Sequence, residues 1–341
     1  MAKKIAINGF GRIGRCVLRI LTDIQDQDIE VVAINDLTKP DMLAHLLKYD
    51  SVHRTFKADV KVEGDAIYVN GRRIVVSAEK DASKLPWKAL GVDLVLECTG
   101  KYKTKEQCQA HISAGAAKVI ISAPAKGEDL TCVVGVNDDK LDVANHTVIS
   151  CASCTTNCLA PVVKVLDDTF GLENGLVTTV HSYTNDQRLL DLPHDDKRRA
   201  RAAAVSMVPS TTGAAAAIGL VLPHLKGKLD GLAVRVPTPD VSLTDLVANL
   251  KVAVTEAQVN EALRAAATSG PMAGILRFET EELVSSDFIG TSYSSIVDAA
   301  NTKVIGGKMV KVLAWYDNEW GFSCRMVDLS RLFLGLPRAK F

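Results

Sequence analysis

The feature that most constrains the fold of this chain is a glycine-rich turn near its N-terminus. An apolar run at residues 5–8 is followed at once by Gly-x-Gly-x-x-Gly at 9–14, and the apolar spacing of residues 15–21 predicts a helix. Such glycines permit a tight turn and let the backbone approach a pyrophosphate, which the helix N-terminus then faces. We therefore predict a strand, turn and helix that begin a doubly wound parallel sheet and bind a dinucleotide. An α/β turn without a ligand is the alternative.

A second apolar run at residues 30–35 strengthens this interpretation, because it ends in an acidic residue. Asp36 lies about 20 residues beyond the glycine motif, where a carboxylate can bind the ribose hydroxyls of NAD. A 2′-phosphate would meet like charge there, so NAD is preferred over NADP. The predicted cofactor-binding residues of this first unit are Gly9, Gly11, Arg12, Ile13, Gly14 and Asp36.

Further apolar runs at 93–97, 118–122, 131–135 and 147–150 alternate with helical stretches such as 104–114, which extends the parallel sheet. Asn70-Gly71 lies between two strand-like runs and predicts a type I′ hairpin inserted beside that sheet. Thr99 and Ser122 fall at strand ends, the edge where such sheets bind ligands. We add both to the candidate cofactor site, with ordinary turn chemistry as the alternative.

Composition narrows the class of protein. A chain of 341 residues with 47% hydrophobic residues predicts about two folded domains, and a net charge of zero gives no global attraction to nucleic acid or membrane. The basic cluster at 197–201 lacks stacking aromatics, so we expect no nucleic-acid site there. Eight cysteines in so long a chain, with no signal peptide at the start, favour a reducing cytoplasm. The uncharged stretch 202–223 contains prolines and glycines and predicts a core segment with a loop, not a membrane span.

Cys154 is the candidate nucleophile. It follows the apolar run 147–150 at the predicted start of a helix, where unpaired backbone N–H groups and the helix dipole favour a thiolate over a thiol. His181 ends another strand-like segment and could hold the thiolate as an ion pair or move its proton. A buried structural cysteine and a structural histidine are the alternatives.

Two further cysteines lie close to Cys154 in the sequence. Cys151 and Cys158 create overlapping pairs with it, yet no second pair with zinc-ligand spacing is present, so we predict no metal site. A reversible disulfide from Cys154 to either neighbour is a hypothesis that this spacing permits.

Six segments in the same order, at 7–15, 153–158, 181–187, 210–216, 235–238 and 315–319, make the chain similar to phosphorylating glyceraldehyde-3-phosphate dehydrogenases. The resemblance implies an NAD-binding domain at 1–152 and 318–341, and a catalytic α+β domain with a largely antiparallel sheet at 153–317. It implies that Cys154 attacks the aldehyde, that His181 acts as base and then acid, and that inorganic phosphate cleaves the resulting thioester to give 1,3-bisphosphoglycerate.

The same resemblance implies roles for further residues. It implies that Asn318 orients the nicotinamide amide and that two sets of residues bind the charged groups of substrate and phosphate: Thr184, Asp186 and Arg235 in one set, and Ser153, Thr155, Arg199, Thr212 and Gly213 in the other. The loop at 191–193 resembles one that closes over a neighbouring subunit's cofactor in a homotetramer.

Two other functions stay open at this point. Residues 319–322 and 45–50 resemble erythrose-4-phosphate dehydrogenases, whereas 182–184 and 210–213 keep the hydroxyl pattern of the triose enzymes, which we favour. A dinucleotide-binding interaction protein without activity is the third possibility, since fold does not guarantee function. The presence of Cys154, His181, Arg235 and Asn318 together argues against it.

Overall fold

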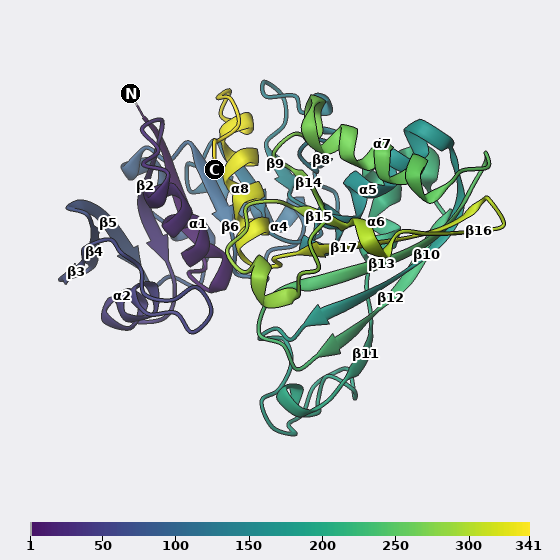
Figure 1. The fold of residues 1–341 in the computed structure, drawn as a ribbon. Helices are drawn as coiled ribbons and strands as arrows, with labels where there is room; N and C mark the ends of the chain where they lie inside the picture. Colours follow the sequence, from purple (N-terminus) through teal and green to yellow (C-terminus); the bar gives the residue numbers. More distant parts are fainter. Residues whose placement is uncertain (1) are drawn as a thin grey trace. The chain divides into compact units, whose positions relative to one another are not determined.

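Residues 2–341, which the computed structural model describes, divide into two compact units. The first contains residues up to 132 together with 139–152 and 323–341, and the second contains 133–138 and 153–322. Residues 133–138 and 318–322, which the sequence analysis assigns to the first domain, lie in the second unit. Figure 1 labels the elements of both.

The first unit is built on a nine-stranded sheet in the order β3-β4-β5-β2-β1-β6-β7-β9-β8. From β5 to β8 all neighbours are parallel, which confirms the predicted doubly wound sheet. Its strands are β1 (Lys3–Asn8), β2 (Ile29–Asn35), β3 (Val60–Glu63), β4 (Ala66–Val69), β5 (Arg72–Ser77), β6 (Leu94–Glu97), β7 (Lys118–Ile121), β8 (Leu130–Thr131) and β9 (Val148–Ser150). Its helices are α1 (Arg12–Asp23), α2 (Pro40–Lys48), α3 (Trp87–Leu90) and α4 (Lys105–Ser113).

Two predicted features of this sheet differ in detail from the structure. The β4–β5 hairpin has positive φ at Asn70 (49°) and Gly71 (79°), as a type I′ turn requires. Because β5 pairs with β2, the hairpin belongs to the nine-stranded sheet and does not merely lie beside it, and β3 is the edge strand. The strand predicted at 131–135 ends at Thr131. Beyond it, the N–H groups of Val133 and Gly135 donate to the Asn137 and Asp138 side chains, which replace strand partners with a local turn.

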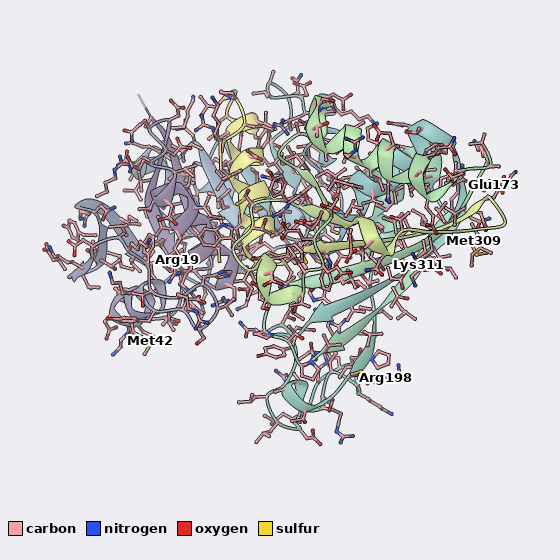
Figure 2. All side chains as sticks on the ribbon, viewed as in Figure 1. Arg19, Met42, Glu173, Arg198, Met309 and Lys311 are labelled. Carbon is pink, nitrogen blue, oxygen red and sulfur yellow. The ribbon has the colours of Figure 1, made fainter. Side chains whose placement is uncertain are left out.

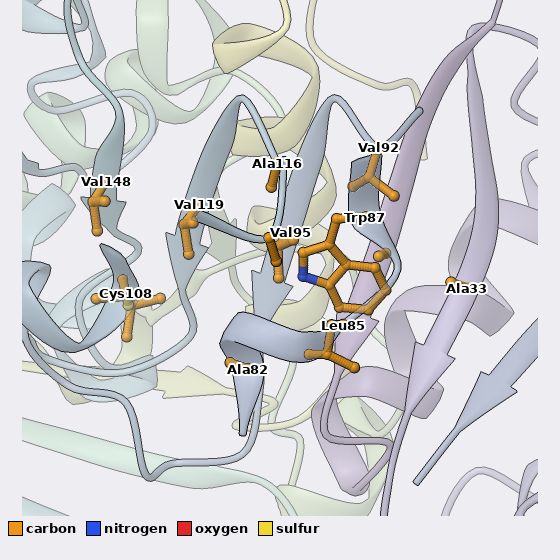
Figure 3. Close-up of a cluster of buried hydrophobic side chains, with 13 residues drawn as sticks. Ala33, Ala82, Leu85, Trp87, Val92, Val95, Cys108, Ala116, Val119 and Val148 are labelled. Carbon is orange, nitrogen blue, oxygen red and sulfur yellow. The ribbon is translucent and has the colours of Figure 1, made fainter. Parts of the chain in front are cut away.

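A buried cluster in the first unit packs around Trp87. Figure 3 shows Trp87 beside Leu85, Val92 and Val95, with Val119 on the neighbouring strand. Trp87 is fully buried, and its indole N–H donates to His111 Nδ1 at 3.1 Å, so the ring is both packed and hydrogen-bonded.

The second unit is an α+β assembly on an eight-stranded sheet, with strand order β11-β12-β10-β13-β17-β15-β14 and β16 paired to β17. The β10–β12 and β14–β15 pairs are parallel and the others antiparallel. The strands are β10 (Leu172–Ser182), β11 (Val208–Thr211), β12 (Leu229–Val236), β13 (Ser242–Leu250), β14 (Leu276–Glu279), β15 (Ser295–Asp298), β16 (Lys303–Ile305) and β17 (Met309–Tyr316), and the helices are α5 (Cys154–Phe170), α6 (Ala214–Val221) and α7 (Glu256–Thr268).

Helix α5 packs across β10, β13, β15 and β17 on one side of this sheet. The side chains of Leu176, Leu232 and Met309 point away from that core and are 67%, 45% and 43% exposed. Figure 2 shows Met309 and Lys311 along β17. The last helix, α8 (Trp320–Phe333), begins in the second unit and ends in the first.

Among residues 2–341 no helix combines the length and apolarity needed to cross a membrane. The uncharged stretch at 202–223 instead holds β11 and α6.

Trp87→Ala tests the packing of the first unit. Truncation of a fully buried tryptophan should lower the free energy of unfolding by about 3–5 kcal/mol, because it removes apolar contacts and leaves a cavity. Urea unfolding followed by circular dichroism measures the shift. Val143→Ala, at a position that is 40% exposed, is the control and should change the free energy by less than about 0.5 kcal/mol. Equal effects of the two substitutions would contradict the packing.

Candidate active site

Cys154 is the first residue of α5, as predicted. Ser153 caps the helix, since its hydroxyl accepts from Thr156 N–H at 3.0 Å. Ala152 just before it has φ of 58°, a left-handed conformation that is unfavourable for a residue with a Cβ. The cap and this bend fix the direction in which α5 starts and hence the position of the Cys154 side chain.

The second unit brings His181 to Cys154 from β10. The distance from Cys154 Sγ to His181 Nε2 is 3.5 Å, which confirms the juxtaposition expected of a nucleophile and its base. His181 is buried, whereas Cys154 keeps partial exposure.

A hydrogen bond on the far side of the imidazole fixes its tautomer. His181 Nδ1 lies 2.7 Å from the Ser182 carbonyl oxygen, and Arg235 Nη1 donates to the same oxygen at 3.1 Å. We assign the proton to Nδ1, because a carbonyl oxygen has two lone pairs and can accept from both donors. The Nε2 lone pair then points to the sulfur. Arg235 Nη1 also lies 2.8 Å from Nδ1, so a positive charge sits beside the imidazole.

The ionisation of this pair differs from the thiolate that the helix position alone predicts. Burial and the nearby Arg235 lower the pKa of His181 to about 3, and burial raises the pKa of the Cys154 thiol against the opposing charge of Arg235 and hydrogen bonds from Thr155. Burial around the sulfur thus opposes the lowered cysteine pKa that the helix position alone predicts. The neutral imidazole is the form able to accept the thiol proton.

Tyr316, at the end of β17, is a residue that the sequence analysis did not single out. Its hydroxyl lies 2.8 Å from Thr155 Oγ1 and 2.8 Å from Thr179 Oγ1, and its ring meets the His181 ring edge-on at 5.8 Å. The motif at 315–319 drew attention to Asn318, two positions later. The alternation of side chains along a strand could have predicted that Tyr316 is buried, but only the tertiary structure shows that its partners are Thr155 and Thr179.

The predicted anion-binding residues form contacts that differ in part from the two predicted sets. Arg199 forms an ion pair with Asp186, which joins one member of each predicted set. Arg199 also donates to Ser210 Oγ at 2.8 and 2.6 Å. Although burial alone would raise it, the bond to Arg199 lowers the pKa of Asp186. Thr184 begins a turn, in which the Thr184 carbonyl oxygen accepts a hydrogen bond from Gln187 N–H at 2.9 Å.

Thr212 and Gly213, two predicted anion-binding residues, directly precede α6. Gly213 is the N-cap of that helix, and Thr212 Oγ1 accepts from Ala214 N–H at 3.2 Å. These N-terminal backbone donors suit an anion. Thr155 differs from the prediction, because its buried hydroxyl is bonded to Tyr316.

The first unit carries a cavity of about 630 Å³ at the carboxyl edge of its sheet. Gly9, Gly11, Asp36 and Thr99 line it, together with Asn8, Asn35, Leu37, Glu79, Lys80, Ala82, Cys98, Lys101 and Tyr102. A Cβ on Gly9 would lie 2.6 Å from Thr99 N, and one on Gly14 would lie 2.5 Å from the Gly9 oxygen. Around Gly11 the space is open, so the turn leaves room at the N-terminus of α1 for a pyrophosphate.

The polar groups at this cavity also suit NAD. Each Asp36 carboxylate oxygen accepts one backbone N–H at 2.9 Å, from Phe10 and Thr38, which orients the remaining lone pairs for ribose hydroxyls. The Arg12 guanidinium pairs with Asp50, so its backbone is the part available to a phosphate. Ile13 follows in the first turn of α1.

The floor of the cavity is a buried polar network that the sequence analysis missed. Glu97 Oε2 accepts from Asn8 Nδ2 at 2.6 Å and lies 3.1 Å from His111 Nε2, while its Oε1 accepts from Thr99 N–H at 2.8 Å. Asn35 Nδ2 donates to Asn8 Oδ1 at 2.7 Å. The signal was available, because Asn8, Asn35 and Glu97 each end a parallel strand at the ligand-binding edge.

Five predicted cofactor residues are not among those that line this cavity, namely Arg12, Ile13, Gly14, Ser122 and Asn318. Ser122 directly follows β7, where its N–H donates to the Glu97 carbonyl at 3.0 Å. Asn318 lies in the second unit, and its Oδ1 accepts from Ser242 Oγ at 2.7 Å.

Comparisons with known proteins agree with this geometry. Residues 3–105 match the family model described as glyceraldehyde 3-phosphate dehydrogenase, NAD binding domain, and residues 153–318 match the model of its C-terminal domain. Glyceraldehyde-3-phosphate dehydrogenase of Geobacillus stearothermophilus is 60% identical over 330 residues, covering 97% of this chain and 98% of the relative. The protein of that name from Thermotoga maritima is 58% identical, with 97% and 99% covered.

His181→Asn tests whether the imidazole accepts the thiol proton. In the unsubstituted protein, the rate of Cys154 alkylation by iodoacetamide should follow a midpoint pH that belongs to the thiol–imidazole pair. Without the acceptor, burial opposes the thiolate alone, so the midpoint should rise by at least about one pH unit. Peptide mass spectrometry against pH measures it. His224→Asn, at an exposed position in the same unit, is the control. An unchanged midpoint pH in His181→Asn would show that His181 does not accept the thiol proton.

Proposed function

The chain belongs to the glyceraldehyde-3-phosphate dehydrogenase family, and on that premise we propose how its residues carry out the NAD-dependent oxidation of glyceraldehyde 3-phosphate. The observation that carries the proposal is the 3.5 Å contact between Cys154 Sγ at the start of α5 and His181 Nε2. Few arrangements other than covalent catalysis by a thiol use such a pair.

Cys154 is the nucleophile and His181 its base. As the sulfur bonds to the aldehyde carbon, the thiol proton passes to Nε2, and the Ser182 carbonyl holds the imidazolium that forms through Nδ1–H. The carbonyl oxygen takes that proton from Nε2 and becomes the hydroxyl of a hemithioacetal, and the neutral His181 accepts the hydroxyl proton again as the carbon is oxidised. NAD, when bound, supplies the hydride acceptor. Inorganic phosphate then attacks the thioester, forming an acyl phosphate and releasing the thiolate of Cys154.

Two groups of residues bind the charges of substrate and attacking phosphate. In one group Arg235, next to His181, and Thr184 are the donors, and Asp186 acts through its ion pair with Arg199. Arg199 acts in the other group with Ser153, Thr155, Thr212 and Gly213. Backbone N–H groups at the starts of α5 and α6 support the second group. Because its hydroxyl is bonded to Tyr316, Thr155 contributes its backbone N–H.

The first unit is the NAD-binding domain and the second the catalytic domain. Gly9, Gly11, Arg12, Ile13 and Gly14 present the backbone to the pyrophosphate, Asp36 binds the ribose, and Thr99 and Ser122 lie along the same edge. Asn318 orients the nicotinamide amide, and its bond to Ser242 supports that role by fixing the amide.

The working form is a cytoplasmic homotetramer without a nucleic-acid or metal partner. Exposed apolar side chains support self-association: Leu176, Leu232 and Met309 lie on the sheet of the second unit, and Leu189, Leu190 and Leu192 on the loop after β10 are 80%, 72% and 58% exposed. Sedimentation velocity tests the subunit count, and a monomer at micromolar concentration would contradict it.

Cys154→Ser tests the nucleophile. NADH formation from glyceraldehyde 3-phosphate should fall by at least about 10³-fold, because an alcohol is a far weaker nucleophile than a thiolate, while NAD binding persists. Cys158→Ser, one helical turn later, is the matched control and should stay active. Full activity of Cys154→Ser would move the nucleophile elsewhere.

In the unsubstituted protein, the rate of NADH formation should collapse without inorganic phosphate. Faster turnover of erythrose 4-phosphate than of glyceraldehyde 3-phosphate would instead support the erythrose-4-phosphate dehydrogenase activity.

Asp36→Ala tests cofactor choice. Removal of the carboxylate should weaken NAD binding and relieve repulsion of a 2′-phosphate, so the ratio of NADP to NAD dissociation constants should narrow by about tenfold. Isothermal titration calorimetry measures both constants. The exposed Asp41→Ala, at the start of α2, controls for a general change of charge. An unaltered ratio in Asp36→Ala would rule out the ribose role.

A further inference from the structure

A row of hydrogen-bonded side chains begins at Trp87 and passes beneath the cavity of the first unit. Trp87 Nε1 donates to His111 Nδ1 at 3.1 Å, and His111 Nε2 lies 3.1 Å from Glu97 Oε2. Asn8 Nδ2 donates to the same carboxylate oxygen at 2.6 Å, and Asn35 Nδ2 donates to Asn8 Oδ1 at 2.7 Å. All five side chains are at most 6% exposed, so protein groups satisfy their polar atoms.

The donors and acceptors at fixed points of the row set its direction. The indole N–H of Trp87 can only donate, so we assign the proton of the His111 ring to Nε2, which donates to Glu97. A carboxylate only accepts, so the Asn8 amide turns its nitrogen toward Glu97 and its oxygen toward Asn35. The orientation of the ring and of both amides is therefore fixed by partners within the protein.

Two ends of the row reach the wall of the cavity. Asn35 Nδ2 donates to the Glu79 carbonyl oxygen at 2.9 Å, and Asn35 Oδ1 accepts from the Glu79 N–H at 2.9 Å. At the carboxylate, Glu97 Oε1 accepts from Thr99 N–H at 2.8 Å and from the Thr99 hydroxyl. Glu79 and Thr99 line the cavity, as do Asn8 and Asn35.

We propose that Glu97 and His111 are positioning residues for NAD, although neither side chain is among those that line the cavity. Glu97 accepts two donors on each oxygen, which is the full capacity of a carboxylate, so it acts on the cofactor through Asn8 and Thr99. His111 in turn holds Glu97, because its Nε2–H occupies a lone pair of Oε2. The proposal rests on the NAD-binding role of the first unit.

The row affects binding because it orders the lining residues before the cofactor arrives. Side chains and backbone that are already fixed lose less conformational entropy when a ligand binds. A break in the row should therefore weaken NAD binding. It should leave the chemical step at Cys154 unchanged, because every residue of the row belongs to the first unit and Cys154 to the second.

Glu97→Gln tests the shared acceptor. Glutamine keeps the shape of the side chain but places an amide N–H₂ where an oxygen accepted hydrogen bonds, so donors face each other at that position. The dissociation constant of NAD, measured by isothermal titration calorimetry, should rise by about tenfold. KM for NAD should rise with it, while kcat changes by less than about twofold. Glu30→Gln, the same change at a half-buried position near the start of β2, is the matched control and should leave NAD affinity unchanged.

Hydrogen exchange separates positioning from a general loss of stability. In unliganded Glu97→Gln, the backbone amides of residues 79–82 and of Thr99 should exchange faster than in the unsubstituted protein, and saturating NAD should protect them again. Val119→Ala removes buried apolar contacts in the cluster around Trp87 without changing the row. It should lower stability and leave the NAD dissociation constant unchanged.

Substitutions at His111 test the row away from the cavity, and they decide alone if Glu97→Gln does not fold. His111→Phe fills the space of the ring without a donor and should raise the NAD dissociation constant by about three- to tenfold. His111→Gln can donate from its amide and should restore most of the affinity. Unchanged NAD affinity in His111→Phe and Glu97→Gln would overturn the proposal, even if both variants lose thermal stability. Failure of the unsubstituted protein to bind NAD would instead refute the cofactor site on which the proposal rests.

Discussion

The contact between Cys154 and His181 is the interaction on which the chemistry of this molecule depends, and much of the second unit serves to hold it. The thiol comes from the first residue of α5 and the imidazole from β10, so their 3.5 Å separation depends on how the helix packs on the sheet. The Ser153 cap fixes one side, and the Ser182 carbonyl with Arg235 fixes the other.

Burial gives this pair its ionisation behaviour. An isolated thiolate or imidazolium loses hydration in such a site, and the positive Arg235 adds to the cost for the imidazole. Transfer of the proton from sulfur to nitrogen instead creates two opposite charges in contact, which costs less than either alone. The site therefore favours a thiol that ionises by giving its proton to a specific neighbour, His181.

The first unit also buries an ionisable group, the carboxylate of Glu97. Glu97 is buried beneath the cavity and is surrounded by donors from Asn8, Thr99 and His111. A buried acceptor that is fully hydrogen-bonded is rigid, because each donor constrains it. The residues that line the cavity are thus held in place before a ligand binds, and this lowers the ordering cost of binding.

The sequence by itself determined the doubly wound sheet, the Asn70-Gly71 hairpin, the glycine turn and the position of Cys154 at a helix start, because each depends on local spacing and backbone chemistry. Only the tertiary structure decided which side chains form hydrogen bonds with one another across the fold. Tyr316 lies 161 residues from Thr155, and Asn8 lies 89 residues from Glu97. The raised pKa of Cys154 has the same origin, since solvent exclusion is set by every segment packed around the sulfur and not by the helix that carries it.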